Sequence, residues 1–253
     1  MMFNIYMIKL IKTFITFLFW FIIFLVFTII CLPFSFLPPK IRYQKNNPFF
    51  FLSFIWNKLL YLVSFIKIKI IDRQNLPTLK TPSIIVANHA SALDVFLLET
   101  VIGNQPHIWL SKDSYSKIPL FGTLMKRMHV VVKRENPKLA AKAIVKAMQL
   151  VKLGPKHIVM FPEGTRFDDG KIHPFMPGFT IFAKKLNMPI VPILITGTNK
   201  IFPKKNLLID STATEVKLVI GKPIYYEHEY SEKEFSKKVH NWFTKTLVNL
   251  NDG

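Results

Sequence analysis

The sequence predicts an α/β fold, because short apolar runs typical of buried strands alternate with segments that carry apolar residues at helical spacing. Ile84–Ala87 is the clearest strand, since it is apolar throughout and begins with three β-branched residues. The clearest helix runs from Pro137 to Leu153, where Asn136 can cap its start and Gly154 ends it. Further strands are predicted at 67–71, 107–110, 129–132, 157–161, 190–195 and 215–220, and further helices at 91–101 and from Ser231 towards Leu250.

The first 66 residues differ in composition from the rest of the chain. No charged residue lies between Thr13 and Pro39, and the run from Phe14 to Leu32 is apolar apart from two threonines, about the length of a helix that crosses a bilayer. A second apolar run, Pro48 to Ile66, is interrupted by two polar residues and is rich in aromatic residues, which is typical of a helix at a membrane interface. We therefore predict an N-terminal membrane anchor at residues 1–66, with helices at about 14–36 and 48–66, and a second domain at residues 67–253.

The sequence leaves open what the first apolar run is and how it is oriented in a membrane. A signal peptide is one alternative, because Lys9 and Lys12 precede the run, but the run is long and no small-residue cleavage pattern follows it. Lys40 and Arg42 place cations on the other side as well, so the positive-inside rule does not orient a span. A hairpin that enters one leaflet fits this symmetry as well as a spanning helix does.

The formal net charge of +19 indicates an anionic partner. Residues 1–66 hold six Lys or Arg and no acid, so they contribute +6 and leave +13 on residues 67–253. The partner is either nucleic acid or an acidic membrane surface. We favour the membrane surface and expect no nucleic acid partner, because the chain has an apolar anchor and no zinc-finger, RNP or helix-turn-helix signature.

A candidate general base follows the predicted strand Ile84–Ala87. In the string from Asn88 to Asp94, His89 lies on a strand-to-helix turn, and Asp94 lies one helical turn into the next segment. An acid at this position could fix the imidazole tautomer and stabilise the imidazolium once His89 has taken a proton. The alternative is a structural capping box, since Ser91 and Asp94 have its spacing.

A candidate phosphate-binding loop follows the predicted strand at 157–161. In the string Phe161 to Arg166, Arg166 offers a planar guanidinium that can grip phosphate at two points. Gly164 allows backbone amides to approach a ligand closely, and Glu163 could accept a hydrogen bond from a substrate hydroxyl. The alternative is an ordinary solvated loop with a Glu/Arg pair.

Together the two strings resemble the glycerolipid acyltransferase family, whose four sequence blocks follow here in the family's order between about Lys69 and Gly221. The more specific blocks are the first, Asn88 to Asp94, and the third, Phe161 to Arg166. The second comprises Lys112 to Gly122 with Val130 to Arg134, and the fourth is Ile190 to Leu194. The resemblance implies a mixed sheet flanked by helices, as in glycerol-3-phosphate acyltransferases.

The resemblance also implies roles for individual residues. His89 would be the general base and Asp94 its orienting acid. The loop that binds glycerol phosphate would comprise Glu163, Gly164, Thr165 and Arg166, with further phosphate contacts from Lys112 and Arg134. The chain departs from the residues usual in the family at Ser114, Tyr115, Phe167 and Met176. These departures concern where the shape of the acceptor would be recognised, and they leave the base and its acid unchanged.

The implied activity is that of a 1-acylglycerol-3-phosphate O-acyltransferase of phospholipid biosynthesis. Such a membrane-bound enzyme moves a fatty acyl group from a thioester donor, acyl-CoA or acyl carrier protein, to the sn-2 hydroxyl of 1-acylglycerol 3-phosphate and gives phosphatidic acid. We expect it at the cytoplasmic face of the cell inner membrane. A relative that acylates glycerol 3-phosphate or a lyso-aminolipid is the near alternative.

Other chemistries lack their sequence signatures. The other histidines show no metal-ligand spacing with cysteine or carboxylates, and there is one cysteine, so we expect no metal and no intramolecular disulfide. Glycine-rich nucleotide loops and a Gly-x-Ser-x-Gly elbow are missing, so we expect no cofactor and direct transfer without an acyl-enzyme. A non-catalytic basic protein that docks on membranes is the rival from another class, but docking needs neither His89 nor Asp94.

Overall fold

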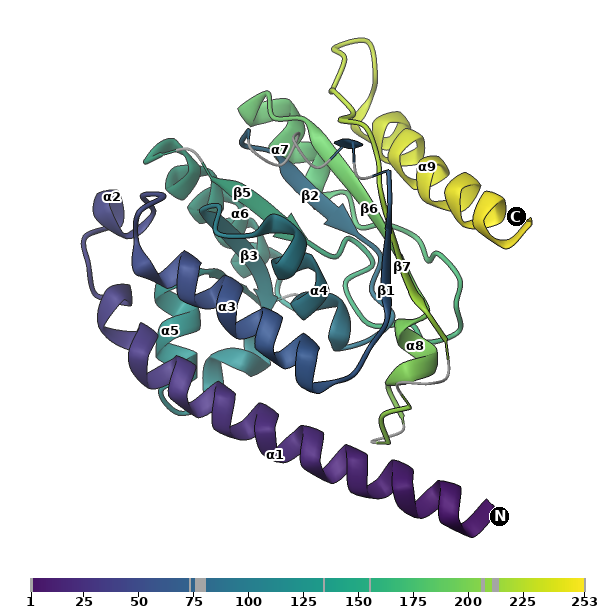
Figure 1. Ribbon diagram of the computed structural model, residues 1–253. Coiled ribbons are helices and arrows are strands. Elements are labelled where there is room, and N and C mark those ends of the chain that lie inside the picture. The colour runs from purple at the N-terminus through teal and green to yellow at the C-terminus, as the bar shows by residue number, and fades with distance from the viewer. Residues whose placement is uncertain are drawn as a thin grey trace.

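The structure, a computed structural model, describes residues 2–72, 74–75, 81–133, 135–154, 156–205, 208–210 and 214–252 of the chain. Its elements are α1 (Met2–Ser35), α2 (Pro39–Arg42), α3 (Pro48–Val63), β1 (Ile68–Ile71), β2 (Ile84–Ala87), α4 (Leu93–Ile102), β3 (His107–Lys112), the 3₁₀ helix η2 (Asp113–Lys117), α5 (Phe121–Met128), β4 (Val130–Val132), α6 (Pro137–Lys152), β5 (His157–Met160), α7 (Gly178–Leu186), β6 (Ile190–Thr196), α8 (Thr198–Ile201), β7 (Val216–Ile220) and α9 (Glu232–Asp252). From β2 onwards strands and helices alternate, which confirms the α/β class (Figure 1).

One mixed sheet of seven described strands forms the centre of the molecule, in the order β1-β7-β6-β2-β5-β3-β4. The five strands from β6 to β4 are parallel, whereas β7 is antiparallel to β6 and β1 is parallel to β7. β2 lies between β5 and β6, with Val86 opposite both Met160 and Pro192. The carboxyl ends of these three strands therefore lie together at one edge of the sheet, where ligands of open α/β sheets usually bind.

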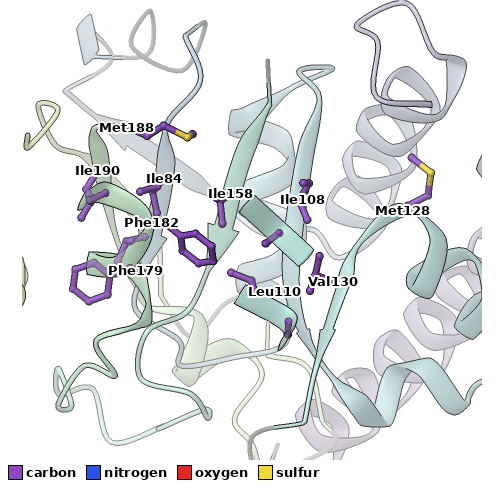
Figure 2. Packing of buried hydrophobic residues seen from close by; sticks show 14 of the residues in the cluster. Ile84, Ile108, Leu110, Met128, Val130, Ile158, Phe179, Phe182, Met188 and Ile190 are labelled. Carbon is purple, nitrogen blue, oxygen red and sulfur yellow. The ribbon is translucent and has the colours of Figure 1, made fainter. Parts of the chain in front are cut away.

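Helices cover both faces of the sheet. Successive strand residues point to opposite faces: Ile84 and Val86 pack in a cluster with Phe179 and Phe182 of α7, whereas Ile85 and its neighbours pack with α4. Figure 2 shows the first cluster, in which Ile84, Ile158 and Ile190 surround the α7 phenylalanines and Ile108 continues the cluster beyond Ile158. Burial on both faces explains why β2 is a continuous apolar run and not an alternating one.

α1 and α3 pack against each other and against the sheet domain (Figure 1). The inward side chains of α1 recur at helical spacing. The Thr16 hydroxyl donates to the Val63 carbonyl at 3.3 Å, the Trp20 indole donates to the Leu60 carbonyl at 3.1 Å, and Phe27 stacks on Trp56 with ring centres 4.2 Å apart. One face of α1 is therefore covered along most of its length.

Polar contacts tie both ends of α1 to later parts of the chain. Near its start, Lys9 pairs with Asp210 at 2.5 Å, and the Ile209 backbone N–H donates to the Thr13 hydroxyl at 3.0 Å. At its end, the Ser35 carbonyl accepts hydrogen bonds from the Arg42 and Arg127 side chains, each at 3.0 Å. These contacts fix the direction of α1 relative to the sheet.

The opposite face of α1 is apolar and exposed. Phe14 is 68% exposed, Phe21 64% and Ile29 55%, and Leu18 and Leu25 continue the same stripe. Within the part of the chain that the structure describes, Tyr6–Ser35 is the one helix long and apolar enough to cross a membrane.

Element boundaries differ by a few residues from those predicted. The helix expected at 14–36 already begins at Met2, the one expected at 48–66 ends at Val63, and the one expected at 91–101 begins at Leu93. The last difference has a physical reason, because Ser91 and Ala92 form part of the turn that carries the site. The division of the chain at residue 66 stays a prediction.

Candidate active site

The two sequence strings meet at the carboxyl edge of the sheet. His89 lies two residues beyond the end of β2, and Glu163 lies three residues beyond the end of the neighbouring strand β5. Backbone hydrogen bonds join the two loops: the Phe167 N–H donates to the His89 carbonyl at 2.9 Å, and the His89 N–H donates to the Glu163 carboxylate at 3.3 Å. Residues more than seventy positions apart thus form one site.

His89 and Asp94 form a hydrogen-bonded pair. The Nδ1 atom of His89 lies 2.9 Å from Oδ2 of Asp94, which is completely buried, while the His89 side chain is 15% exposed. A carboxylate can only accept, so Nδ1 carries the proton and Nε2 has a free lone pair. This is the tautomer that a general base needs.

The Asp94 carboxylate is held by four donors. Its Oδ2 also accepts the backbone N–H groups of Ala90 at 2.7 Å and Ser91 at 2.8 Å, and its Oδ1 accepts the hydroxyl of the buried Thr198 at 2.7 Å. The bond to Ser91 is the one that a capping interaction would supply, so one carboxylate both caps the turn and orients His89. The two interpretations of this spacing are compatible.

The imidazole ring of His89 is also fixed from one side by an aromatic stack. The Phe161 ring lies parallel to it, with centres 3.9 Å apart and an interplanar angle of 7°. Trp109 of β3 packs behind Phe161 at 5.5 Å, and its indole N–H donates to the buried Glu99 of α4. The stack restricts rotation of the imidazole, and the hydrogen bond to Asp94 sets its tautomer.

Glu163 is buried, and its environment favours the neutral acid. Burial raises the pKa of Glu163 to about 7, against the hydrogen bonds that it accepts from the backbone N–H groups of His89 and His173. Both oxygens thus face the protein's own backbone and hold the loop that follows β5. A contact between Glu163 and a substrate hydroxyl stays a prediction.

The remaining predicted site residues spread along the same edge. Gly164 has φ +74°, a left-handed conformation that suits glycine. Thr165 is exposed and Arg166 is partly exposed. Among the described residues, no carboxylate lies within 4 Å of the Arg166 guanidinium. Lys112 is exposed at the carboxyl end of β3, two strands and therefore roughly 10 Å away from β2. Arg134 lies outside the described residues.

Three contributors to the site escaped the sequence analysis. Thr198 and the ring stack of Phe161 are described above, and the Asn88 side chain locks the turn to β6 through two 2.8 Å hydrogen bonds with the Ile195 backbone. A signal for Thr198 existed, since Gly197–Thr198 directly follows the strand that contains the fourth block. Among the residues that the structure describes, no group of three His, Cys, Asp or Glu side chains is arranged to hold a metal ion.

Comparison with known proteins places this site in a family. The family model described as acyltransferase matches residues 67–196, which include both strings. The chain is 35% identical over 194 residues, 76% of its length, to the 1-acyl-sn-glycerol-3-phosphate acyltransferase BAT2, chloroplastic, of Brassica napus, and 34% identical over 176 residues, 69% of its length, to LPAT1, chloroplastic, of Arabidopsis thaliana. It covers 54% and 48% of these proteins, about half of their length.

A solved structure shares the fold. The crystal structure of the 1-acyl-sn-glycerophosphate acyltransferase PlsC from Thermotoga maritima superposes with a TM-score of 0.77 at 24% identity, covering 96% of this chain and 98% of that one. The mixed sheet flanked by helices is thereby confirmed. Since the family model spans half of the chain and contains the His89–Asp94 pair, the chain belongs to the acyltransferase family.

Proposed function

We propose that the protein transfers a fatty acyl group from a thioester donor to the sn-2 hydroxyl of 1-acylglycerol 3-phosphate and so forms phosphatidic acid. The observation that carries this proposal is the His89–Asp94 pair, whose free Nε2 lies at the carboxyl edge of the sheet. The names of the relatives point to the same acceptor. The donor would be acyl-CoA or acyl carrier protein, and no cofactor is needed.

The chemistry follows from what each side chain can do. Nε2 of His89 takes the proton of the acceptor hydroxyl as its oxygen attacks the thioester carbonyl, and Asp94 stabilises the imidazolium that forms. When the tetrahedral intermediate collapses, the carbon–sulfur bond breaks and the imidazolium returns the proton to the departing thiolate. Backbone N–H groups near the turn would stabilise the oxyanion.

The acceptor phosphate would bind beside His89, at the loop that follows β5. Arg166 has no carboxylate partner among the described residues, so its guanidinium can receive a phosphate, and Lys112 adds a second cation along the edge. We extend this role to Gly164 and Thr165, whose backbone lines the same loop, and to Arg134 on the strength of the sequence alone.

A donor and acceptor panel tests the activity. Purified full-length protein is assayed with radiolabelled acyl-CoA and acyl carrier protein against 1-acylglycerol 3-phosphate, glycerol 3-phosphate and a lyso-aminolipid. His89→Ala should lower the rate about 100- to 10,000-fold, whereas His228→Ala, at an exposed histidine outside the site, should leave it unchanged. A His89→Ala variant that keeps more than about a tenth of the rate would rule out the proposed base.

We also propose that α1 lies along one leaflet and does not cross the bilayer. Its inner face contacts the domain from Lys9, paired with Asp210, to Ser35, bonded to Arg127, so a spanning helix would draw the domain into the hydrocarbon. Its outer stripe, which includes Phe14, Phe21 and Ile29, is left free for lipid. The domain would then rest on the membrane surface, which we expect to be the cytoplasmic face of the inner membrane.

Vesicle binding tests this placement. Phe21→Lys puts a charge in the exposed stripe and should weaken sedimentation with anionic vesicles, because a charged side chain is costly in hydrocarbon. Val145→Lys makes the same change on α6, where the side chain is 48% exposed, and should have no such effect. Equal sedimentation of the two variants would contradict a lipid contact of this stripe.

A further inference from the structure

A pocket adjoins the turn that carries His89, beside the loop that follows Arg166. It has a volume of about 380 Å³ and lies at the carboxyl end of β6, where Asn88 and Ala90 form one wall and the start of β7 forms another. Loop residues 170–172, the beginning of α8 and the end of α9 complete it. This volume falls within the range of small-molecule sites, and its wall includes both neighbours of His89.

The pocket is built by specific contacts. Asn88 fastens the catalytic turn to β6, and the Asn199 side chain of α8 donates to the Asp168 carbonyl at 3.1 Å, which holds the loop that follows Arg166. Gly197, with φ +91°, lets the β6–α8 turn lie against the chain before β7: a Cβ there would lie 2.7 Å from the Glu215 carbonyl oxygen. The walls are therefore fixed to one another through β6, α8 and the 168–172 loop.

The lining is cationic. Lys171, Lys200 and Lys217 line the pocket together with one acid, Glu215. Among the described residues, neither Lys200 nor Lys217 has a carboxylate within 4 Å. Lysine is a strong point charge for phosphate, and two lysines with no carboxylate nearby in the described part of the chain suit a phosphate group.

The acceptor does not need this pocket. If the proposed function holds, as this inference assumes, the phosphate of the acceptor is received by Arg166 and Lys112. Neither Arg166 nor Lys112 lines the pocket, so its three lysines form a different set of cations. Two substrates must meet at His89, and the second is the thioester donor. Both common carriers of fatty acyl thioesters, CoA and acyl carrier protein, present the thiol on a phosphopantetheine arm.

We propose that this pocket, bounded by Lys171, Lys200 and Lys217, binds the phosphate of the donor's phosphopantetheine arm and so directs the thioester towards His89. The pocket recognises a feature common to CoA and acyl carrier protein. The lysines act by binding and orientation only, since they lie outside the His89–Asp94 pair.

Direct binding tests the proposal without turnover. Full-length protein in detergent is titrated calorimetrically with CoA at low salt, as wild type, as Lys200→Gln/Lys217→Gln, and as the control Lys142→Gln/Lys146→Gln, which removes the same charge from exposed positions of α6. The pocket variant should raise the Kd for CoA about tenfold or more, because two charge-assisted contacts are lost. The control should bind like wild type, and pantetheine, which lacks the phosphate, should bind both variants equally.

Three results would overturn the proposal. They are an unchanged Kd for CoA in the pocket variant, an equal loss in the control, or a selective loss of binding to 1-acylglycerol 3-phosphate, which would make the pocket an acceptor site. If wild type does not bind CoA, the same variants are titrated with acyl carrier protein with and without its phosphopantetheine, and equal binding of the two forms overturns the proposal. Because binding is read without catalysis, an inactive protein that shows the expected Kd changes would refute the proposed function and leave this site in place.

Discussion

Replacing Glu163 with Gln should make the stability of the protein depend less on pH. Glu163 is 5% exposed, and burial raises the pKa of its carboxyl from 4.5 to about 7. Between these values the folded protein keeps a proton that the unfolded chain releases. The contribution of this group to the free energy of unfolding is therefore fully present below pH 4.5 and is lost as the pH rises through 7.

The size of the effect follows from the pKa difference. At about 1.4 kcal/mol per pKa unit, the wild type should lose roughly 3 kcal/mol between about pH 4 and 8 through this carboxyl alone. The Gln side chain keeps a carbonyl that can accept one of the two backbone N–H groups, and it does not titrate. The stability of Glu163→Gln relative to wild type should therefore rise by roughly 3 kcal/mol over the same range.

Urea unfolding followed by tryptophan fluorescence measures this difference in a fixed detergent at several pH values. Glu229→Gln is the matched control, because its carboxyl is exposed and its substitution should change the stability by less than about 0.5 kcal/mol at any pH. If the difference in the free energy of unfolding between Glu163→Gln and wild type stayed constant from acid to alkaline pH, Glu163 would be ionised in the folded protein at neutral pH. That result would refute the reasoning.

Three further predictions concern the site and the anchor. Thr198→Val removes the hydroxyl that donates to Asp94, so kcat should fall up to about tenfold with little change in KM. Thr198→Ser, which keeps the hydroxyl, should restore kcat. A change in KM alone would contradict a positioning role. Arg166→Ala should raise KM for the phosphate-bearing acceptor by about 10- to 100-fold, while KM for the donor stays near the wild-type value; equal changes would show that Arg166 does not bind the phosphate. Full-length protein should stay on anionic vesicles in high salt, whereas a variant without residues 1–66 should be released as salt screens its remaining +13; release of both would leave only a peripheral attachment.

Much of this site could be predicted because its chemistry is local in sequence. His89 and Asp94 are five positions apart on one turn, and Glu163 to Arg166 follow one strand, so each string contains its own functional spacing. The apolar run of β2 has the burial on both faces that its sequence indicates. The two strings meet because the parallel strands β2 and β5 place their carboxyl ends at one edge of the sheet.

The rest depends on contacts between distant segments. Thr198 reaches Asp94 across more than a hundred residues, and the parallel stack of Phe161 on His89 depends on the register of β2 against β5. The placement of α1 was left open because apolar composition does not distinguish a face that packs on protein from one that meets lipid. The polar bonds of Thr13, Thr16 and Ser35 make that distinction, and their partners could not be predicted from α1 itself.

The order in which these contacts can form has a consequence for biosynthesis. α1 is synthesised about 200 residues before its partners: Lys9 and Thr13 contact Asp210 and Ile209. Likewise, β1 pairs in the sheet with β7, which is made much later. During most of translation, a long apolar helix and an unpaired strand would face the cell interior, a state that favours aggregation. Early insertion of α1 into lipid would shelter its apolar surface until residues 209–220 emerge, so the bilayer would protect nascent chains from aggregation as a holding chaperone does.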